Sequence, residues 1–189
     1  MTVILIGGTP GTGKTSIAKI LGSRLGCDVV SMSELADASG CISAEDKHRQ
    51  TGIIDEDCLV EALIDLVENK KGRVIIEGHY IDLVPSSSVE LVIILRAHPA
   101  NLRVRLASRD YPEAKIRENV EAEVIGVCQM DAIEVFDPNI VYEIDTTDMK
   151  APETVEEILS ILDAEVIPLR IDWMEELEAE GNLDEFLSD

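Results

Sequence analysis

The sequence predicts an α/β fold: a five-stranded parallel sheet with helices on both faces. Short, nearly continuous apolar segments alternate with segments in which apolar residues recur at helical spacing. Strands that are buried on both faces have this apolar character, and the alternation favours parallel strands joined by right-handed crossovers. The expected strands are residues 3–6, 28–30, 74–76, 91–95 and 140–144.

A glycine-rich loop follows the first expected strand. Residues 8–15 read Gly-Thr-Pro-Gly-Thr-Gly-Lys-Thr and fit the pattern G-x-x-x-x-G-K-[ST] at every fixed position. An amphipathic helical pattern comes next, which is the context that this motif requires. Glycines let backbone N–H groups approach phosphate oxygens, and a helix N-terminus favours an anion. The sequence therefore predicts a P-loop NTPase fold that binds ATP.

Four side chains are candidates for the chemistry. Lys14 should bridge the β- and γ-phosphates, and the Thr15 hydroxyl should ligate Mg²⁺. Glu77 ends an apolar strand, where a P-loop enzyme needs a carboxylate to hold the Mg²⁺ shell or to orient water. His79 either faces the phosphates or hydrogen-bonds to the loop backbone, and the sequence leaves both readings open.

Size, charge and cysteine content narrow the class of protein. A chain of 189 residues, 46% hydrophobic, suits one globular domain. The net charge of −22 argues against non-specific nucleic-acid binding; it fits either a basic protein partner or a solvated surface. Without a long apolar run or a leader pattern, we expect a cytoplasmic protein that does not enter a membrane.

The four cysteines are expected to be buried thiols in a reducing compartment: Cys27, Cys41, Cys58 and Cys128.

Helices are expected between the strands. Asp55 is a good N-cap for a helix that ends near residue 69, and prolines 99, 112 and 152 are typical of helix starts. Residues 32–54 lack clear periodicity, so we expect a small, mobile insert of short helices there. Four arginines either lie on a solvated surface or bind a polyphosphate with their positive charges: Arg96, Arg103, Arg105 and Arg109.

The C-terminal residues 166–189 form an acidic extension. Eight acidic residues and no basic one lie between Asp172 and the end of the chain, and Trp173 and Leu177 share a helical face. The extension is either an amphipathic helix that folds back onto the domain or an arm for a basic partner.

Together these segments resemble a known family, the archaeal and eukaryotic small adenylate kinases of the ribosome-biogenesis type, also called the coilin-interacting nuclear ATPases. The resemblance covers about residues 1–165. It rests on the glycine loop, Ile54-Asp-Glu-Asp57, Glu77-Gly-His79, and Ser108-Arg-Asp-Tyr111 with Lys115, Glu118 and Asn119.

The resemblance implies a nucleoside monophosphate kinase with an acceptor-binding insert, residues 30–53, and a lid, residues 108–118. It implies the reaction ATP + AMP ⇌ 2 ADP with Mg²⁺, an ATPase side activity, and a basic small-subunit ribosomal protein as a partner in rRNA processing, without sequence-specific contact to nucleic acid. It also implies that ATP phosphates bind to Gly11, Gly13, Lys14, Thr15, Ser16 and, from the lid, Arg109.

Two positions depart from the family pattern. Glu77 stands where the family has Asp, and its longer side chain favours metal contact through water. Asp37 stands where the family has an Arg for the AMP phosphate, which Arg49 or Arg96 could replace. Two alternatives therefore stay open: an ATP-hydrolysing assembly factor with little kinase activity, and a kinase for another small acceptor.

Overall fold

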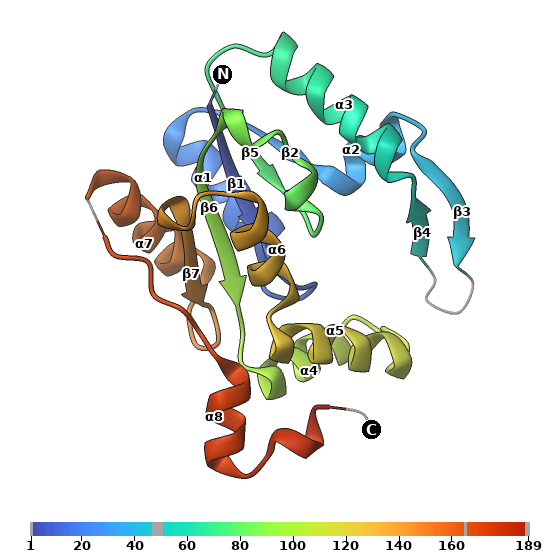
Figure 1. Ribbon diagram of the computed structural model, residues 1–189, viewed down its shortest axis with the longest axis vertical. Coiled ribbons are helices and arrows are strands. Elements are labelled where there is room, and N and C mark those ends of the chain that lie inside the picture. The colour runs from blue at the N-terminus through green and yellow to red at the C-terminus, as the bar shows by residue number, and fades with distance from the viewer. Residues whose placement is uncertain (1, 47–50, 165, 188–189) are drawn as a thin grey trace.

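The computed structural model describes residues 2–46, 51–164 and 166–187. Within these ranges five strands form one sheet in the order β2-β5-β1-β6-β7, and every neighbouring pair is parallel. The five predicted strands and their parallel arrangement are confirmed, with β1 in the centre (Figure 1). The strands are β1 (Thr2–Gly7), β2 (Asp28–Ser31), β5 (Arg73–Glu77), β6 (Val89–Arg96) and β7 (Val141–Asp145).

Helices cover both faces of this sheet, as predicted. Ile4 and Ile6 of β1 pack toward α1 (Lys14–Leu25) and α7 (Ala151–Asp163). Val3 and Leu5 alternate with them and face the opposite side. Because both faces are covered, the strands are apolar at nearly every position. The opposite side is covered by α2 (Met32–Ala38), α3 (Glu56–Asn69) and α6 (Val127–Val135).

A third apolar cluster lies beyond the carboxyl end of β6, where α8 packs beside α4 and α5 (Figure 1). Leu177 and Phe186 of the C-terminal extension are buried in it. The extension therefore folds back onto the domain, which was one of the two expected readings. The elements that form this third cluster are α4 (Pro99–Ala107), α5 (Glu113–Ile125), α8 (Trp173–Glu180) and the 3₁₀ turn η4 (Leu183–Glu185).

Residues 32–54 contain a helix and a β-hairpin. After α2, β3 (Ile42–Asp46) pairs antiparallel with β4 (Thr51–Ile54). The expectation of short helices alone is wrong for the second half, where β-branched isoleucines favour strands. The predicted N-cap is confirmed, because the Asp55 carboxylate accepts a hydrogen bond from the Cys58 amide at 3.1 Å.

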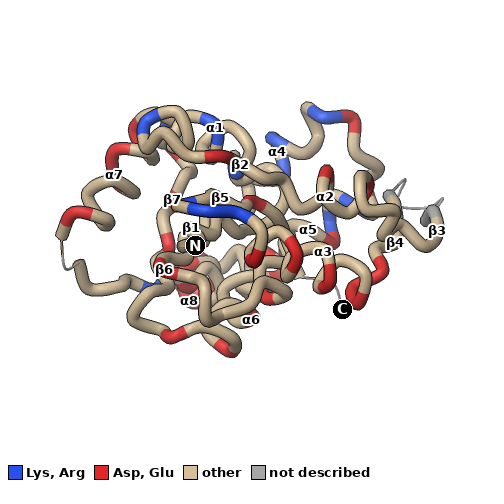
Figure 2. Tube along the Cα trace, turned by 90° about the horizontal axis from the view of Figure 1, so that it is seen from above, with Lys and Arg blue, Asp and Glu red and all other residues tan. Residues whose placement is uncertain are grey.

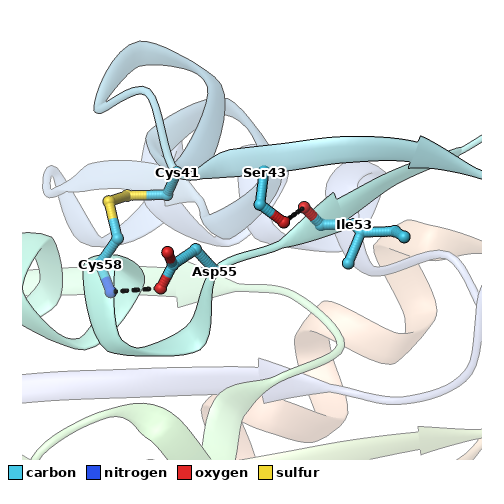
Figure 3. Close-up of a disulfide and its surroundings, with 5 residues drawn as sticks. All are labelled: Cys41, Ser43, Ile53, Asp55 and Cys58. Atoms are coloured by element: carbon cyan, nitrogen blue, oxygen red, sulfur yellow. Dashed lines mark hydrogen bonds between the residues drawn. A yellow bond between two sulfur atoms is a disulfide. The ribbon is translucent and has the colours of Figure 1, made fainter.

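A disulfide joins Cys41 to Cys58, which lie 17 residues apart (Figure 3). Cys41 precedes the hairpin and Cys58 lies in the first turn of α3. The Asp55 amide donates to the Cys41 carbonyl at 2.8 Å, which brings this turn against Cys41. The expectation of four free thiols is therefore wrong for this pair, while Cys27 and Cys128 do carry free thiols.

The remaining helices begin near the prolines that predicted them. α4 begins at Pro99, α5 follows Pro112, and Pro152 lies in the first turn of α7. Gly126, with a φ of 79°, separates α5, whose buried apolar residues include Ile116, Val120 and Val124, from α6, which begins at Val127. Three short 3₁₀ turns complete the described elements: η1 (Ile81–Leu83), η2 (Ser86–Ser88) and η3 (Pro138–Ile140). In the described part of the chain, no helix has the length and apolar character needed to cross a membrane.

Candidate functional site

The P-loop, residues 8–15, connects β1 to α1 in a conformation that needs glycine. At Gly8 the φ angle is 134°, and a Cβ atom would lie 2.4 Å from the Leu95 carbonyl oxygen of β6. Gly13 caps α1 with a φ of 104°, in the left-handed region that other residues rarely adopt. The glycines therefore let the loop pass close to β6 and enter the helix with its N–H groups directed outward.

Lys14 lies over this loop with its ammonium group on backbone oxygens. Its Nζ atom donates to the carbonyl of Gly8 at 2.7 Å and of Thr9 at 3.1 Å. Burial lowers the pKa of Lys14, and the nearby Cys128 and Glu77 act in the opposite direction. An ammonium with only carbonyl partners can exchange them for phosphate oxygens, which carry full negative charge.

Glu77 and Thr15 form the one pair of candidate metal ligands that the sequence predicted. Glu77 is 5% exposed at the end of β5, and the Thr15 hydroxyl donates to its Oε1 atom at 3.1 Å. The described residues contain no cluster of three or more His, Cys, Asp or Glu side chains that could hold a metal. One hydroxyl and one carboxylate suit Mg²⁺, which keeps several waters and takes its other ligands from phosphates. The donor set therefore fits Mg²⁺.

His79 contacts the loop backbone, which agrees with one of the two readings that the sequence left open. Its Nδ1 atom lies 3.4 Å from the Cys128 sulfur, and its ring hydrogen-bonds to the Gly8 backbone. Burial and the neighbouring Lys14 lower the pKa of His79, which favours the neutral imidazole. Burial also raises the pKa of the Cys128 thiol to about 11, so the thiol stays protonated. His79 is thus anchored to the loop and lines the cavity described next.

A cavity of about 420 Å³ lies between the P-loop, the insert and the segment from α4 to α5. Its volume is in the range of small-molecule sites. Among the described residues that line it, Lys14, Arg109 and Lys115 are cationic and none is acidic, although the chain carries a net charge of −22. The lining comprises Pro10, Gly11, Gly13, Lys14, Thr15, Ser16, Met32, Ser33, Ile54, Gly78, His79, Tyr80, Arg109, Tyr111, Lys115 and Asn119.

A smaller hollow of about 220 Å³ lies on another side of the P-loop. Arg105 lines it and is held by the loop after β7, because its Nη2 atom donates to the carbonyls of Thr146 at 2.6 Å and Thr147 at 2.8 Å. The P-loop therefore borders two spaces. Both are lined by Gly11, Gly13 and Ser16.

The structure brings most of the predicted site residues together. Gly11, Gly13, Lys14, Thr15, Ser16, His79 and Arg109 line the large cavity. Glu77 does not line it but contacts Thr15.

Arg96 is not part of the site. It is 2% exposed and forms ion pairs with Glu123 and Glu143, each at 2.8 Å. Its interpretation as a cation for phosphate is therefore wrong, because its charge is already committed to buried carboxylates. Arg49, the other suggested substitute, lies outside the described residues, and Asp37 is exposed.

Three more residues that line the cavity belong to the motif on which the family resemblance rests, although no individual chemical role was assigned to them from the sequence. Tyr111, Lys115 and Asn119 lie at intervals of four, and the Lys115 ammonium lies 4.4 Å from the centre of the Tyr111 ring. Lys115 and Asn119 lie one turn apart on α5, and Tyr111 precedes that helix.

Comparisons with known proteins agree with this geometry. A family model described as "AAA domain" matches residues 4–126. The "Adenylate kinase isoenzyme 6 homolog FAP7" of Saccharomyces cerevisiae is 37% identical over 142 residues, which cover 75% of this chain and 71% of the yeast protein. A "Putative adenylate kinase" of Methanothermobacter thermautotrophicus is 40% identical and covers 84% of this chain and 87% of its own length. The protein of the same name from Archaeoglobus fulgidus is 39% identical, with 98% of both chains covered.

Solved structures show the same fold at low sequence identity. A sugar kinase from Janibacter sp. HTCC2649 superposes with a TM-score of 0.60 at 17% identity, covering 90% of this chain and 99% of the other. Shikimate kinase from Acinetobacter baumannii gives 0.59 at 18% identity, covering 85% and 92%. This chain therefore belongs to the family of the archaeal proteins named putative adenylate kinase and the yeast adenylate kinase isoenzyme 6 homolog.

Proposed function

We propose that the protein is an adenylate kinase that transfers the γ-phosphoryl group of ATP to AMP and forms two ADP. The observation that carries this proposal is the cationic lining of a 420 Å³ cavity in a strongly acidic protein. Two nucleotides with four phosphate groups between them need such a lining, and a surface of the chain's average charge would repel them.

The P-loop is the proposed site for the ATP phosphates, held by the glycine-loop amides, Lys14, Thr15 and Ser16. The smaller hollow beside Thr146 and Met149 is then the place for the nucleoside part of ATP. Support comes from the three residues that border both spaces, because a phosphate chain that crosses them reaches from the hollow into the cavity.

The large cavity is the proposed site for AMP. Met32 and Ser33 of the insert, residues 30–53, and the adjoining Ile54 offer an apolar side with one hydroxyl for the base. Lys115 and Arg109 offer cations for the acceptor phosphate. Met32 and Ser33 are the residues of α2 that line the cavity, and Asp37 does not line it. An acceptor arginine after Ala36 is therefore not required by this arrangement.

Positioning and charge neutralisation account for the proposed transfer, which needs no covalent nucleophile. Lys14 and Arg109 stabilise the charge on the transferring group. Residues 108–118 act as a lid that excludes water, since water would otherwise take the phosphoryl group. Thr15 and Glu77 are the proposed holders of Mg²⁺, Glu77 through a bound water, and the ion would neutralise phosphate charge.

An acceptor panel tests the kinase proposal. The protein is incubated with ATP, Mg²⁺ and each of AMP, dAMP, CMP or shikimate, and the products are separated. We expect rapid ADP formation with AMP and little with shikimate, and none in the Lys14→Ala variant. Phosphate release at one rate with every acceptor, or with none, would instead support an ATPase.

We also propose an ATPase side activity linked to small ribosomal subunit maturation. The apolar side of α8 is buried, so a partner would meet its acidic side, which carries four glutamates: Glu175, Glu176, Glu178 and Glu180. Acidic residues also spread over α3 and α7 (Figure 2). Such a surface is complementary to a basic ribosomal protein. Phosphate release measured with and without a basic small-subunit protein tests this, and an unchanged rate counts against it.

A further inference from the structure

One buried carboxylate joins the P-loop to the C-terminal extension. Glu123 of α5 is 2% exposed. Its Oε2 atom accepts a hydrogen bond from the Thr9 hydroxyl at 2.5 Å. Its Oε1 atom accepts from the indole N–H of Trp173 at 3.1 Å, from Arg96 Nε at 2.8 Å and from the Ala97 amide at 3.0 Å. The two carboxylate oxygens of Glu123 thus bind Thr9 of the P-loop and Trp173, the first residue of α8.

The extension also completes the charge balance of this network. Arg96 faces two buried carboxylates, of which Glu143 Oε2 lies 2.8 Å from Nη1. Arg170 of the extension lies 3.6 Å from the other oxygen of Glu143. The amide of Ile171 donates to Glu143 at 3.2 Å, and its carbonyl accepts from Arg96 at 3.1 Å. Because a buried carboxylate is costly without a cation, Arg170 and Ile171 stabilise the charges that surround Glu123.

Glu123 is well placed to set the geometry of the site. The Thr9 carbonyl accepts hydrogen bonds from Thr12 Oγ1 at 2.9 Å and from Lys14 Nζ at 3.1 Å, so the orientation of Thr9 affects Lys14. On α5, Lys115 and Asn119 lie two turns and one turn before Glu123. A shift of Glu123 therefore moves both Thr9 of the P-loop and α5, whose residues Lys115 and Asn119 line the cavity.

We infer that the C-terminal extension positions the P-loop for ATP, and that Trp173 is a positioning residue that acts through Glu123. Trp173 is 3% exposed, and among the described residues it is not one of those that line the cavity or the smaller hollow. The extension also lies beyond residues 4–126, which the family model matches. The inference rests on the proposed function only in that the P-loop binds ATP.

A double-mutant cycle tests the inference. Trp173→Phe keeps an aromatic side chain, although a smaller one, and removes the N–H donor. Thr9→Val removes the hydroxyl at the other oxygen of Glu123. The affinity for the Mg²⁺ complex of a non-hydrolysable ATP analogue is measured by calorimetry, with the melting temperature of each variant. Each single change should weaken binding roughly fivefold to tenfold. The double variant should bind about as weakly as Thr9→Val alone, because both changes interrupt one path. If the losses of affinity in the two single variants multiply in the double variant, the inference is overturned.

Matched controls separate positioning from packing. Leu177→Ala removes a buried side chain of α8 that cannot hydrogen-bond to Glu123, so its effect on affinity should multiply with that of Thr9→Val. Met174→Ala alters a side chain that is 40% exposed and should leave affinity unchanged. The affinity of the double variant Leu177→Ala/Thr9→Val is compared with that of Trp173→Phe/Thr9→Val. If both double variants depart equally from the product of their single effects, the role of Trp173 is packing only.

The fluorescence of Trp173, the sole tryptophan of the chain, gives a second measurement if Trp173→Phe does not fold. In the unaltered protein, saturation with the analogue should shift the emission, and Thr9→Val should abolish the shift while analogue binding remains measurable. Unchanged emission in the unaltered protein would contradict the inference. These titrations contain no AMP, so a protein that lacks transfer to AMP but binds ATP gives the same result.

Discussion

The Thr15 hydroxyl donates to Glu77 Oε1 at 3.1 Å and so joins the first turn of α1 to the end of β5. The strand register explains this contact, because Glu77 lies opposite Ile6 of the central strand, just before the P-loop begins. One oxygen from the first turn of α1 and one from the end of β5 are therefore adjacent. We expect that little rearrangement is needed to hold a hydrated cation there.

Replacement of Glu77 by Gln should raise the Mg²⁺ concentration needed for half-maximal rate by roughly tenfold, since the amide keeps the shape but loses the charge. The measurement is initial rate against Mg²⁺ concentration at saturating ATP and AMP. Glu90→Gln is the control, because Glu90 lies near the opposite end of β6 in an ion pair with Arg73. An unchanged Mg²⁺ requirement in Glu77→Gln would remove Glu77 from the proposed metal site.

The pH dependence should reveal the ionisation of Lys14. Burial lowers the pKa of Lys14 below its usual 10.5, so the free enzyme loses this charge as the pH rises through the lowered value. Bound phosphates stabilise the ammonium and raise its pKa again. The alkaline fall of kcat/KM, which reports the free enzyme, should therefore lie at lower pH than the fall of kcat. Lys14→Arg, which stays charged, should show no alkaline fall in its residual activity; the same fall in both proteins would exclude Lys14 as its origin.

Arg109→Ala should reduce kcat about 100-fold or more while changing the affinity for ATP less than about tenfold, because the lid charge acts mainly on the transition state. Steady-state kinetics and direct ATP titration separate the two effects. Arg103→Ala is the control from the same arginine-rich region, since Arg103 contacts the Phe186 ring and the Glu185 carbonyl and not the cavity. A loss confined to ATP affinity would count against a transition-state role for Arg109.

Reduction of the Cys41–Cys58 disulfide should destabilise the protein by about 3 kcal/mol, the chain-entropy value for a loop of this length. The measurement is urea unfolding with and without dithiothreitol. The double variant Cys41→Ala/Cys58→Ala should be insensitive to the reductant, and Cys27→Ala should respond as the unaltered chain does. If reductant destabilises the double variant equally, the bond is not the cause.

Local patterns were sufficient to predict the sheet and the P-loop. The five strands are apolar because both faces of the sheet are buried, and this property shows in each short segment by itself. The glycines of the P-loop are dictated by backbone geometry that depends on few residues, such as the approach of Gly8 to Leu95. The helix starts at Asp55 and Pro99 are likewise local.

Contacts between distant segments could not be predicted in this way. The sequence shows that Arg96 is charged, but its partners Glu123 and Glu143 follow 27 and 47 residues later on other elements. The disulfide was missed because neither cysteine belongs to a recognisable spacing, and pairing depends on where α3 begins relative to Cys41. The hairpin of the insert was missed because Gly52 and polar residues interrupt its alternation.

The central position of β1 has a consequence for hydrogen exchange. The P-loop emerges from the strand with two neighbours on each side, whereas β3 and β4 form a separate two-stranded sheet. Backbone amides in such a pair open at lower free energy than those of a buried central strand. The amide protons of β3 and β4 should therefore exchange through local opening, while those of β1, which supports the P-loop, should exchange only when the whole domain unfolds.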